Sequence, residues 1–293
     1  MLEEFERYLK IKGLSEATIK AYMIGIKQFK SYIKKSLKTA NLRDIDDFIW
    51  FYRGKGSKNT PLNLKLNAIK RFYKWLKRTE EVSYDIERIL EYESLPTREV
   101  ERQIIDEGQI GMLLDMVDEP RDKAMISILF NCGLRVSELQ GLKKNNFIDK
   151  IDEKGYVVVK IVRSKNDKNR NVYMTPYYYQ FVKDYMYSHH NSETKVFTRL
   201  DIPSEPLVNL KTMIERVKKL TREILGVELT PHDFRASCFT HLYRKGVDIY
   251  SIAELAGHSS IETTRGYIQA DEQDVVSKTL GAFQNEDLTN DDK

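Results

Sequence analysis

The sequence has little cysteine and no long apolar run. Two cysteines, Cys132 and Cys238, occur among 293 residues, too few for a disulfide framework or a cysteine-rich zinc site. Both lie in apolar helical contexts, where buried free thiols are expected. No apolar segment approaches the roughly 18–20 residues that span a bilayer, and the charged N-terminus, MLEEFERYLK, is unlike a signal peptide. These absences predict a cytoplasmic protein without a membrane partner.

Charge is plentiful and unevenly distributed. Hydrophobic residues make up 41% of the chain and charged residues 31%, which is typical of a globular protein with enough apolar material for a core. The net charge is +4, yet residues 1–98 hold 21 Lys and Arg against 13 Asp and Glu, so residues 99–293 are net negative. A basic N-terminal third favours a polyanionic partner, although basic helix faces are also common in solvent.

Helical periodicity dominates the first 80 residues. Ser15 is placed to cap a long helix with apolar positions on one face, and a second long helix begins near Asn59, with Pro61 in its first turn. Shorter helices are predicted near residues 2–11 and 43–52. The pattern predicts a small all-α bundle at the N-terminus.

Lysines line a face beside the apolar face of each long helix. Lys20 and Lys27 lie seven residues apart on the first helix, and Lys70 and Lys74 lie four apart on the second. Residues at these spacings share one side of a helix, so each pair forms part of a positive stripe. These lysines are candidates for contacts with DNA phosphates, and an ordinary solvated basic surface is the alternative.

The organisation changes between residues 79 and 106. This stretch is rich in charge and has no sustained hydrophobic period. The last nine residues, NEDLTNDDK, are polar and acidic, which favours disorder. The predicted divisions are an N-terminal helical domain at 1–94, a linker at 95–106, a second domain at 107–284 and a disordered acidic tail at 285–293.

The second domain is predicted to be mainly α-helical with a small β-sheet, an α+β fold. Strand-forming residues at 156–162 and 170–174 flank the polar turn SKNDKN, which predicts a β-hairpin. Gly133 is placed to end the helix that precedes it. Other segments with a helical period predict helices near residues 107–117, 120–131, 176–187, 207–223, 231–245, 248–256 and 260–268.

Histidine and arginine concentrate in two motifs near the C-terminus, TPHDFR at 230–235 and AGHSSIETTRGY at 256–267. His232 and Arg235 lie three apart on a predicted helix, so their side chains share a face and can point at one anion. Arginine suits a phosphate because its planar guanidinium stays protonated and matches two oxygens. Upstream, Arg135 follows the helix stop in GLRVSEL, from where its side chain can reach a cleft.

Each of these features also has an ordinary explanation. An arginine after a helix stop is usually on the surface, a Pro-His-Asp run is often a helix cap, and tyrosine is common in cores and on surfaces. Their order along the chain is more specific. Arg135, a hairpin lysine, His232-x-x-Arg235, His258 and, nine residues later, Tyr267 together resemble the tyrosine recombinase family, which includes phage integrases and Xer-type recombinases.

The resemblance covers nearly the whole chain, with departures at two places. Ala236 stands where the family often has a second histidine, although this is not one of the core catalytic positions. The hairpin turn lacks the Gly-Lys-Gly that is common in relatives. Lys165 keeps the expected place of the hairpin lysine, but Lys168 and Arg170 lie nearby as alternatives.

The resemblance implies that a tyrosine attacks a DNA phosphodiester and forms a 3′-phosphotyrosine. Tyr267 is the implied nucleophile, His232 its general base or hydrogen-bond partner, and Lys165 the acid for the departing 5′ oxygen. Glu138 is expected to hold either Arg135 or His232 in place. The residues implied to bind the phosphate oxygens are Arg135, Arg235 and His258.

The resemblance also implies an architecture and partners. A SAM-like N-terminal helical domain clamps double-stranded DNA at specific sites, a catalytic domain cuts it, and a homotetramer, or a heterotetramer with a paralogue, assembles on the DNA. No metal, ATP or other cofactor is implied. Either dimer resolution or the integration and excision of a mobile element fits. Val275, Val276, Leu280 and Phe283 suit a helix that docks on a neighbouring subunit or on its own domain.

Other activities fit the sequence less well. A type IB topoisomerase uses the same chemistry on one duplex, but the strings GLRVSEL and AGHSSIETT look more like recombinases. A DNA-binding protein without catalysis would usually have lost one of the six polar residues. A two-metal nuclease needs a cluster of carboxylates that this sequence does not offer.

Overall fold

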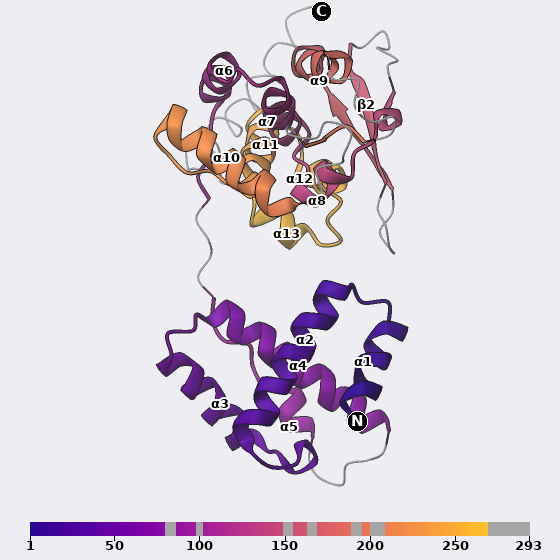
Figure 1. Cartoon of the computed structure of the whole chain (residues 1–293), viewed down its shortest axis with the longest axis vertical. Coiled ribbons are helices and arrows are strands. Elements are labelled where there is room, and N and C mark those ends of the chain that lie inside the picture. The colour runs from indigo at the N-terminus through magenta and orange to yellow at the C-terminus, as the bar shows by residue number, and fades with distance from the viewer. Residues whose placement is uncertain are drawn as a thin grey trace, which may run out of the picture. The chain divides into compact units, whose positions relative to one another are not determined.

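The structure is a computed structural model that describes residues 1–79, 86–97, 102–148, 155–162, 169–188, 195–199 and 209–268. It divides into two compact units, Met1–Glu99 and Val100–Lys293 (Figure 1). The division falls within the stretch predicted as a linker, and the bounds of that linker stay a prediction. The predicted tail at 285–293 lies outside the described residues.

The first unit is a helical bundle whose longest members are α2 (Glu16–Ile33) and α4 (Asn59–Arg78). Ser15 caps α2 as predicted, because its side chain accepts a hydrogen bond from the Thr18 N–H at 3.2 Å. The other helices are α1 (Leu2–Ile11), η1 (Leu37–Thr39), α3 (Leu42–Gly54) and α5 (Glu87–Leu90). The two long helices pack through buried apolar faces that include Ile19, Met23, Ile26, Phe29, Leu62, Leu66, Ile69 and Phe72.

The short helix α5 lies in a stretch where the sequence has no hydrophobic period. Ile86 and Ile89 are nevertheless buried in the core of the first unit, and a single turn is too short to display a period. The chain that follows is held to α4, because the side chain of Asn63 donates to the Leu95 carbonyl at 2.9 Å and accepts from the Leu95 N–H at 2.8 Å.

The second unit contains a three-stranded antiparallel sheet in the order β1-β2-β3 (Figure 1). β2 (Val157–Ile161) and β3 (Arg170–Met174) form the predicted hairpin, with Val159 opposite Val172. β1 (Phe147–Ile148) was not predicted, since two residues are too few for an alternating pattern. Alternate residues of β2 are buried, so one face of the sheet packs on the core.

The second unit is otherwise helical in the part that the structure describes. Its elements are α6 (Glu107–Met116), α7 (Pro120–Cys132), α8 (Val136–Gly141), η2 (Lys144–Asn146), α9 (Pro176–Ser188), α10 (Leu210–Leu225), α11 (Pro231–Arg244), α12 (Ile249–Ala256) and α13 (Ile261–Arg265). α7 is buried along most of its length and packs against α9 and α11. The predicted helices are present, although α13 is shorter than expected and the short α8 was missed.

The helices α7 and α12 both end at glycines. Gly133 after α7 and Gly257 after α12 adopt the left-handed conformation, with φ of 58° and 62°. A Cβ on Gly133 would lie only 2.8 Å from the ring of Phe239, so this position has no space for a side chain. These turns leave the last carbonyl groups of α7 and α12 beside α11.

Candidate active site

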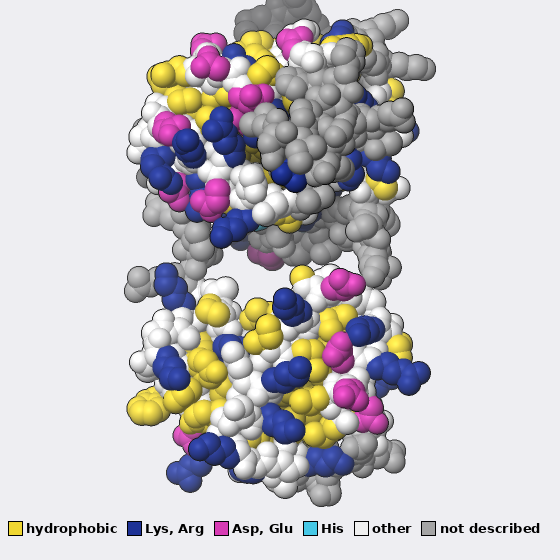
Figure 2. Space-filling model, in the orientation of Figure 1, with side chains coloured by type: hydrophobic (Ala, Val, Ile, Leu, Met, Phe, Trp, Pro, Cys, Tyr) yellow, Lys and Arg dark blue, Asp and Glu magenta, His cyan; other side chains and the backbone are white. Residues whose placement is uncertain are grey.

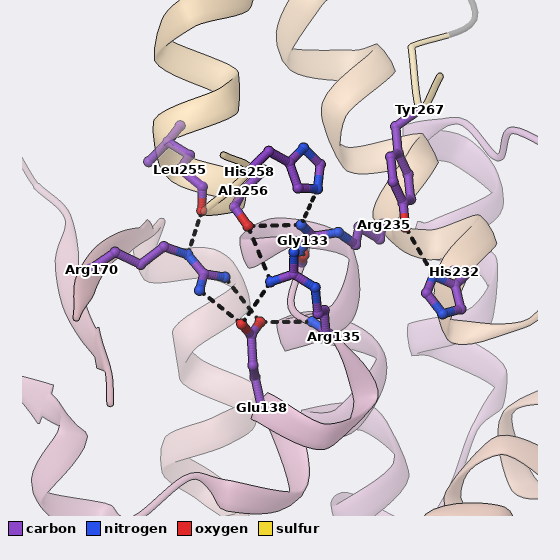
Figure 3. Close-up of polar contacts among 10 residues, drawn as sticks. All are labelled: Gly133, Arg135, Glu138, Arg170, His232, Arg235, Leu255, Ala256, His258 and Tyr267. Carbon is purple, nitrogen blue, oxygen red and sulfur yellow. Dashed lines mark hydrogen bonds and ion pairs between the residues drawn. The ribbon is translucent and has the colours of Figure 1, made fainter. Parts of the chain in front are cut away.

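Polar side chains from several distant segments converge at the ends of α7 and α12 (Figure 3). Each comes from the end of an element or from a loop beside one, where a side chain is free to turn inward. The converging residues are Arg135 and Glu138 of the α8 region, Arg170 of β3, His232 and Arg235 of α11, His258 after α12 and Tyr267 after α13. The structure thus brings together every described residue that was predicted to be catalytic.

Arg235 is the most enclosed charge in this cluster, with none of its surface exposed. Its Nη1 donates to the Gly133 carbonyl, and its Nη2 donates to the Ala256 carbonyl at 2.8 Å. Burial, together with the charge of Arg135, lowers the pKa of Arg235 to about 10, so the guanidinium remains protonated at neutral pH. Its Nε has no hydrogen-bond partner among the described residues. A buried cation with a spare donor is suited to an incoming anion.

Main-chain carbonyls at helix C-termini hold the arginines in place. The last carbonyls of a helix have no partner within it, and the helix dipole makes that end negative. Arg170 Nε donates to the Leu255 carbonyl at 2.7 Å, and Arg135 Nη1 makes a longer contact of 3.5 Å with the Ala256 carbonyl. The ends of α7 and α12 therefore stabilise a concentration of positive charge.

Glu138 is a carboxylate that two arginines share. Arg170 donates to both of its oxygens, at 2.8 and 2.9 Å, and Arg135 donates from its backbone N–H at 2.9 Å and from Nη1 at 3.1 Å. Burial alone would raise the pKa of Glu138, but the hydrogen bonds and charges of both arginines outweigh it and lower the pKa to about 2. Of the two partners that the sequence left open, Arg135 is the one that Glu138 binds here.

The imidazole of His232 faces the phenol of Tyr267, with Nδ1 at 3.2 Å from Oη (Figure 3). Burial, followed by the charges of Arg102 and Arg235, lowers the pKa of His232 and favours the neutral imidazole. A neutral imidazole that carries its proton on Nε2 leaves Nδ1 free to accept a proton. The pair is therefore arranged for transfer of the phenol proton to His232.

His258 stacks on the ring of Tyr267, with the ring centroids 5.4 Å apart. Its Nε2 lies 2.9 Å from Arg235 Nη2, and its Nδ1 lies 2.9 Å from Thr264 Oγ1. Because a guanidinium only donates, Nε2 accepts the first bond and Nδ1 carries the proton. A phosphate oxygen at Nε2 would require a second proton on the ring or the other tautomer. The role of His258 as a donor to phosphate stays a prediction.

The hairpin lysine cannot be placed, because Lys165 and its alternative Lys168 lie outside the described residues. Arg170, the third alternative, is described. Its guanidinium is bound by Glu138 and by the Leu255 carbonyl, and only 7% of its side chain is exposed. A guanidinium held by a carboxylate and a carbonyl in this way is poorly placed to act as the acid. Arg170 is therefore an anchor within the site.

The lysines proposed to contact DNA belong to the first unit. Lys20 and Lys27 on α2 and Lys74 on α4 are exposed, whereas Lys70 is partly buried. Figure 2 shows Lys and Arg side chains spread across the visible face of this unit. Lys27 also borders a surface hollow whose lining includes Lys30, Ser31, Lys34 and Lys35. Their assignment to DNA stays a prediction.

The sequence reasoning did not predict the places that two arginines, Arg102 and Arg170, take at this site. Arg102, from the predicted linker, has its guanidinium carbon 4.8 Å from the centroid of the Tyr267 ring. No periodicity surrounds it, so the sequence carries no signal for this contact. Arg170 was considered only as an alternative acid. Its place as the first residue of a strand, beside the hairpin turn, is the signal that could have identified it as an anchor.

Some features are absent from the part of the chain that the structure describes. No group of three or more His, Cys, Asp or Glu side chains there could hold a metal ion. Among the same residues, no helix is both long enough and apolar enough to cross a bilayer. Cys132 and Cys238 are both buried free thiols, as predicted. The prediction of chemistry without a metal stays a prediction.

Comparison with protein families gives two matches, one in each part of the chain. Residues 103–274 match the phage integrase family, and residues 1–81 match the phage integrase N-terminal SAM-like domain. Tyrosine recombinase XerA of Pyrococcus furiosus is 29% identical over 272 residues, which cover 91% of this chain and 88% of that protein. Tyrosine recombinase XerC of Myxococcus xanthus is 30% identical over 287 residues, which cover 92% of each.

Solved structures of similar fold span almost the whole chain. The XerH site-specific recombinase bound to its palindromic difH substrate superposes with a TM-score of 0.73 at 19% identity, covering 95% of this chain and 84% of that one. The crystal structure of XerA recombinase gives a TM-score of 0.53 at 24% identity and covers 96% and 97%. At these identities the likeness concerns the fold: a SAM-like helical domain followed by a mainly helical domain with a small sheet.

Proposed function

This chain belongs to the phage integrase family and is an Xer-like, site-specific DNA recombinase, and from that membership we propose which of its residues cut and rejoin the DNA. Tyr267 is the nucleophile and His232 its general base. The observation that carries this assignment is the 3.2 Å contact between His232 Nδ1 and Tyr267 Oη, beside the buried guanidinium of Arg235.

The scissile phosphate binds to Arg135 and Arg235. A phosphodiester resists attack because its anionic oxygens repel a nucleophile, and fixed guanidinium groups offset that charge most strongly in the transition state. Arg235 is buried with an unpartnered Nε, and one third of the Arg135 side chain (33%) is exposed, which supports binding of a phosphate that approaches from solvent. Among the described residues, Glu138 is the carboxylate that pairs with Arg135, and Arg235 donates to main-chain carbonyls, so the site favours an anion.

Cleavage is a single exchange of bonds at phosphorus. The phenol proton of Tyr267 passes to Nδ1 of His232, the phenol oxygen bonds to phosphorus, and the bond from phosphorus to the 5′ oxygen breaks. Lys165 supplies the proton for that oxygen. The products are a 3′-phosphotyrosine and a free 5′ hydroxyl. The ester keeps the bond energy, so a 5′ hydroxyl from another strand can reverse the step without ATP.

The DNA partner is a duplex with specific sites, held in part by Lys20, Lys27, Lys70 and Lys74. Exchange between two duplexes breaks four strands, and each chain supplies one nucleophile, so four subunits act together as a homotetramer or with a paralogue. The solved XerH complex contains its difH substrate, and lambda integrase has been solved as a tetramer on a Holliday junction, which supports this assembly. The apolar segment proposed to dock between subunits, residues 275–283, lies outside the described residues.

The test uses a duplex with a nick close to the cleavage point, so that the short cut fragment diffuses away and the covalent complex accumulates. The first requirement is a target, found as inverted repeats around a central spacer that the purified protein protects from nuclease. The wild type should form an adduct that survives detergent and forms in EDTA. Tyr267→Phe should form none, although its affinity for DNA should be unchanged because the ring remains.

A matched control is Tyr250→Phe, since Tyr250 is a tyrosine of the same unit with 69% of its surface exposed. This variant should form the adduct at the wild-type rate. Protease digestion and mass spectrometry should locate the nucleotide on the peptide that contains Tyr267. An adduct that persists in Tyr267→Phe would remove Tyr267 from its role, and a strict requirement for magnesium would contradict the mechanism.

A further inference from the structure

Arg102 makes a contact with the proposed nucleophile that the reaction described above does not use. Its guanidinium carbon lies 4.8 Å from the centroid of the Tyr267 ring, closer than that of Arg235, at 5.5 Å. A guanidinium at this distance from an aromatic face is attracted to the ring electrons. Arg102 therefore restrains the ring whose hydroxyl must meet the phosphate.

The backbone near Arg102 is fixed to the helix that carries the base. The Ile105 N–H donates to Ser237 Oγ at 3.0 Å, and Ser237 Oγ donates to the Asp233 carbonyl at 2.7 Å, both on α11. Ile105 is itself buried. Arg102 lies three positions before Ile105, so its backbone is anchored close to the helix that carries His232. This local anchoring distinguishes Arg102 from a surface arginine that meets a ring by chance.

The guanidinium of Arg102 has no ion-pair partner among the described residues, and its buried Nε has no hydrogen-bond partner there. Within that part of the chain the guanidinium contacts the Tyr267 ring. After burial, its charge is the largest contribution that lowers the pKa of His232. A cation stabilises negative charge nearby, and the Tyr267 phenol, whose ring the guanidinium contacts, gains such charge when its proton leaves.

We propose that Arg102 is a positioning residue for Tyr267: it holds the phenol against His232 and supplies a positive field that favours the phenolate as the proton leaves. This inference rests on the proposed role of Tyr267. It assigns a function to a residue near the start of the second unit, in a stretch that the sequence alone marks only as a linker.

The test compares Arg102→Met, which keeps the length of the side chain and removes its charge, with Arg102→Lys, which keeps the charge and loses the planar group. Single-turnover cleavage of the nicked substrate should fall about tenfold in Arg102→Met, the size expected for a desolvated cation–π contact, and by less in Arg102→Lys. At a saturating concentration of protein, this rate does not depend on the affinity for DNA. Lys219→Met is the control for loss of one charge, since Lys219 is exposed and pairs with Glu223.

The dependence of cleavage on pH separates a positioning role from a purely structural one. Loss of the Arg102 charge removes one cause of the lowered His232 pKa, so in Arg102→Met the fall in rate on the acidic side should move to higher pH. Arg102→Lys should keep the wild-type profile. Because burial also lowers the pKa of His232, Arg102→Lys controls for altered packing: a profile that moves in Arg102→Met and not in Arg102→Lys reports the charge. The charged or titratable groups around His232 that must stay unchanged are Arg135, Asp233, Arg235 and Tyr267.

Two results would overturn the inference. One is wild-type cleavage in Arg102→Met, and the other is a slower rate with an unmoved pH profile. In either case an adduct still mapped to Tyr267 in the wild type leaves the proposed nucleophile intact, so failure of the Arg102 role can be told from failure of the proposed function. A thermal unfolding midpoint measured for both variants shows whether each is folded when its rate is compared.

Discussion

Arg170 donates to both carboxylate oxygens of Glu138, at 2.8 and 2.9 Å, and the same carboxylate holds Arg135. A residue of β3 thus helps to hold Arg135, the arginine of another element that we propose binds the phosphate. Both partners of the Arg170–Glu138 pair are more than nine-tenths buried, so water does little to screen it.

We expect Arg170→Met to destabilise the protein by about 3 kcal/mol, because it leaves the buried Glu138 charge with one fewer partner. Cleavage should also slow, since Arg135 loses a fixed support. Urea unfolding of Arg170→Met, Glu138→Gln and the double variant forms a double-mutant cycle. The loss of unfolding free energy in the double variant should differ clearly from the sum of the losses in the two single variants. Purely additive losses would show that the pair does not act as a unit.

The free energy of unfolding should depend on pH in the acidic range because of Glu138. Its pKa is about 2 in the folded protein against an ordinary value of 4.5, so the folded state binds this proton more weakly than the unfolded state does. The stabilisation is complete above about pH 4.5 and disappears as the pH falls toward 2, with a loss of about 3 kcal/mol. Denaturant unfolding of the wild type and Glu138→Gln across this range measures it. The variant should lack this component of the slope, and parallel curves would contradict the prediction.

Arg135→Ala should lower the cleavage rate by about 10²–10³ with little change in folding, because the side chain is partly exposed and acts on the phosphate. Arg235→Ala should lower both activity and stability, since it empties a fully buried site, removes the donor to the Gly133 carbonyl and leaves the Ala256 carbonyl with only the 3.5 Å contact of Arg135. Single-turnover cleavage and circular dichroism separate the effects. Wild-type cleavage by Arg135→Ala would exclude it from the site.

The acid role of Lys165 can be tested by changing the leaving group. Lys165→Ala should cut ordinary DNA slowly, because the departing 5′ oxygen then lacks a proton donor. A substrate with sulfur in place of that bridging oxygen needs no acid, since a thiolate is a far better leaving group, and its cleavage should be restored. Lys168→Ala is the matched control within the same hairpin turn. If the sulfur substrate restored cleavage in Lys168→Ala and not in Lys165→Ala, Lys168 would be the acid.

Lysine contacts with DNA should appear in the dependence of affinity on salt. Each phosphate contact that is lost should reduce the slope of log affinity against log salt by about one. Exchange of Lys20, Lys27, Lys70 and Lys74 together for alanine should therefore lower that slope by up to about four. Unchanged affinity and slope would show that these lysines form an ordinary solvated surface.

The fold could be predicted largely from local signals. Ser15 and Gly133 have residue types that cap or end helices wherever they occur, and both do so here. The β2–β3 hairpin followed from strand-forming residues on both sides of a polar turn. β1 and α5 could not be predicted, because two residues or one turn of helix are too short to show a hydrophobic period. Tertiary packing stabilises these two elements.

The candidate site was predictable where a motif carried it and not elsewhere. His232 and Tyr267 follow from motif order, and the structure adds their hydrogen bond. Arg102 could not be found in this way, because its contact joins residues 165 positions apart and depends on the path of a segment without periodicity. The tautomer of His258 is likewise beyond sequence reasoning, since it follows from which atom faces Arg235.

The arginines of this site are tied to the carbonyls of Gly133, Leu255 and Ala256, and peptide carbonyls are the same in every amino acid. The side chains of Leu255 and Ala256 can therefore be substituted in evolution without loss of the anchoring hydrogen bonds, provided that the backbone at the end of α12 keeps its position. The constraint falls on the two glycines that turn the chain, and most strictly on Gly133, where Phe239 leaves no room for a Cβ. A designer who transplants this site should copy a backbone path before copying side chains.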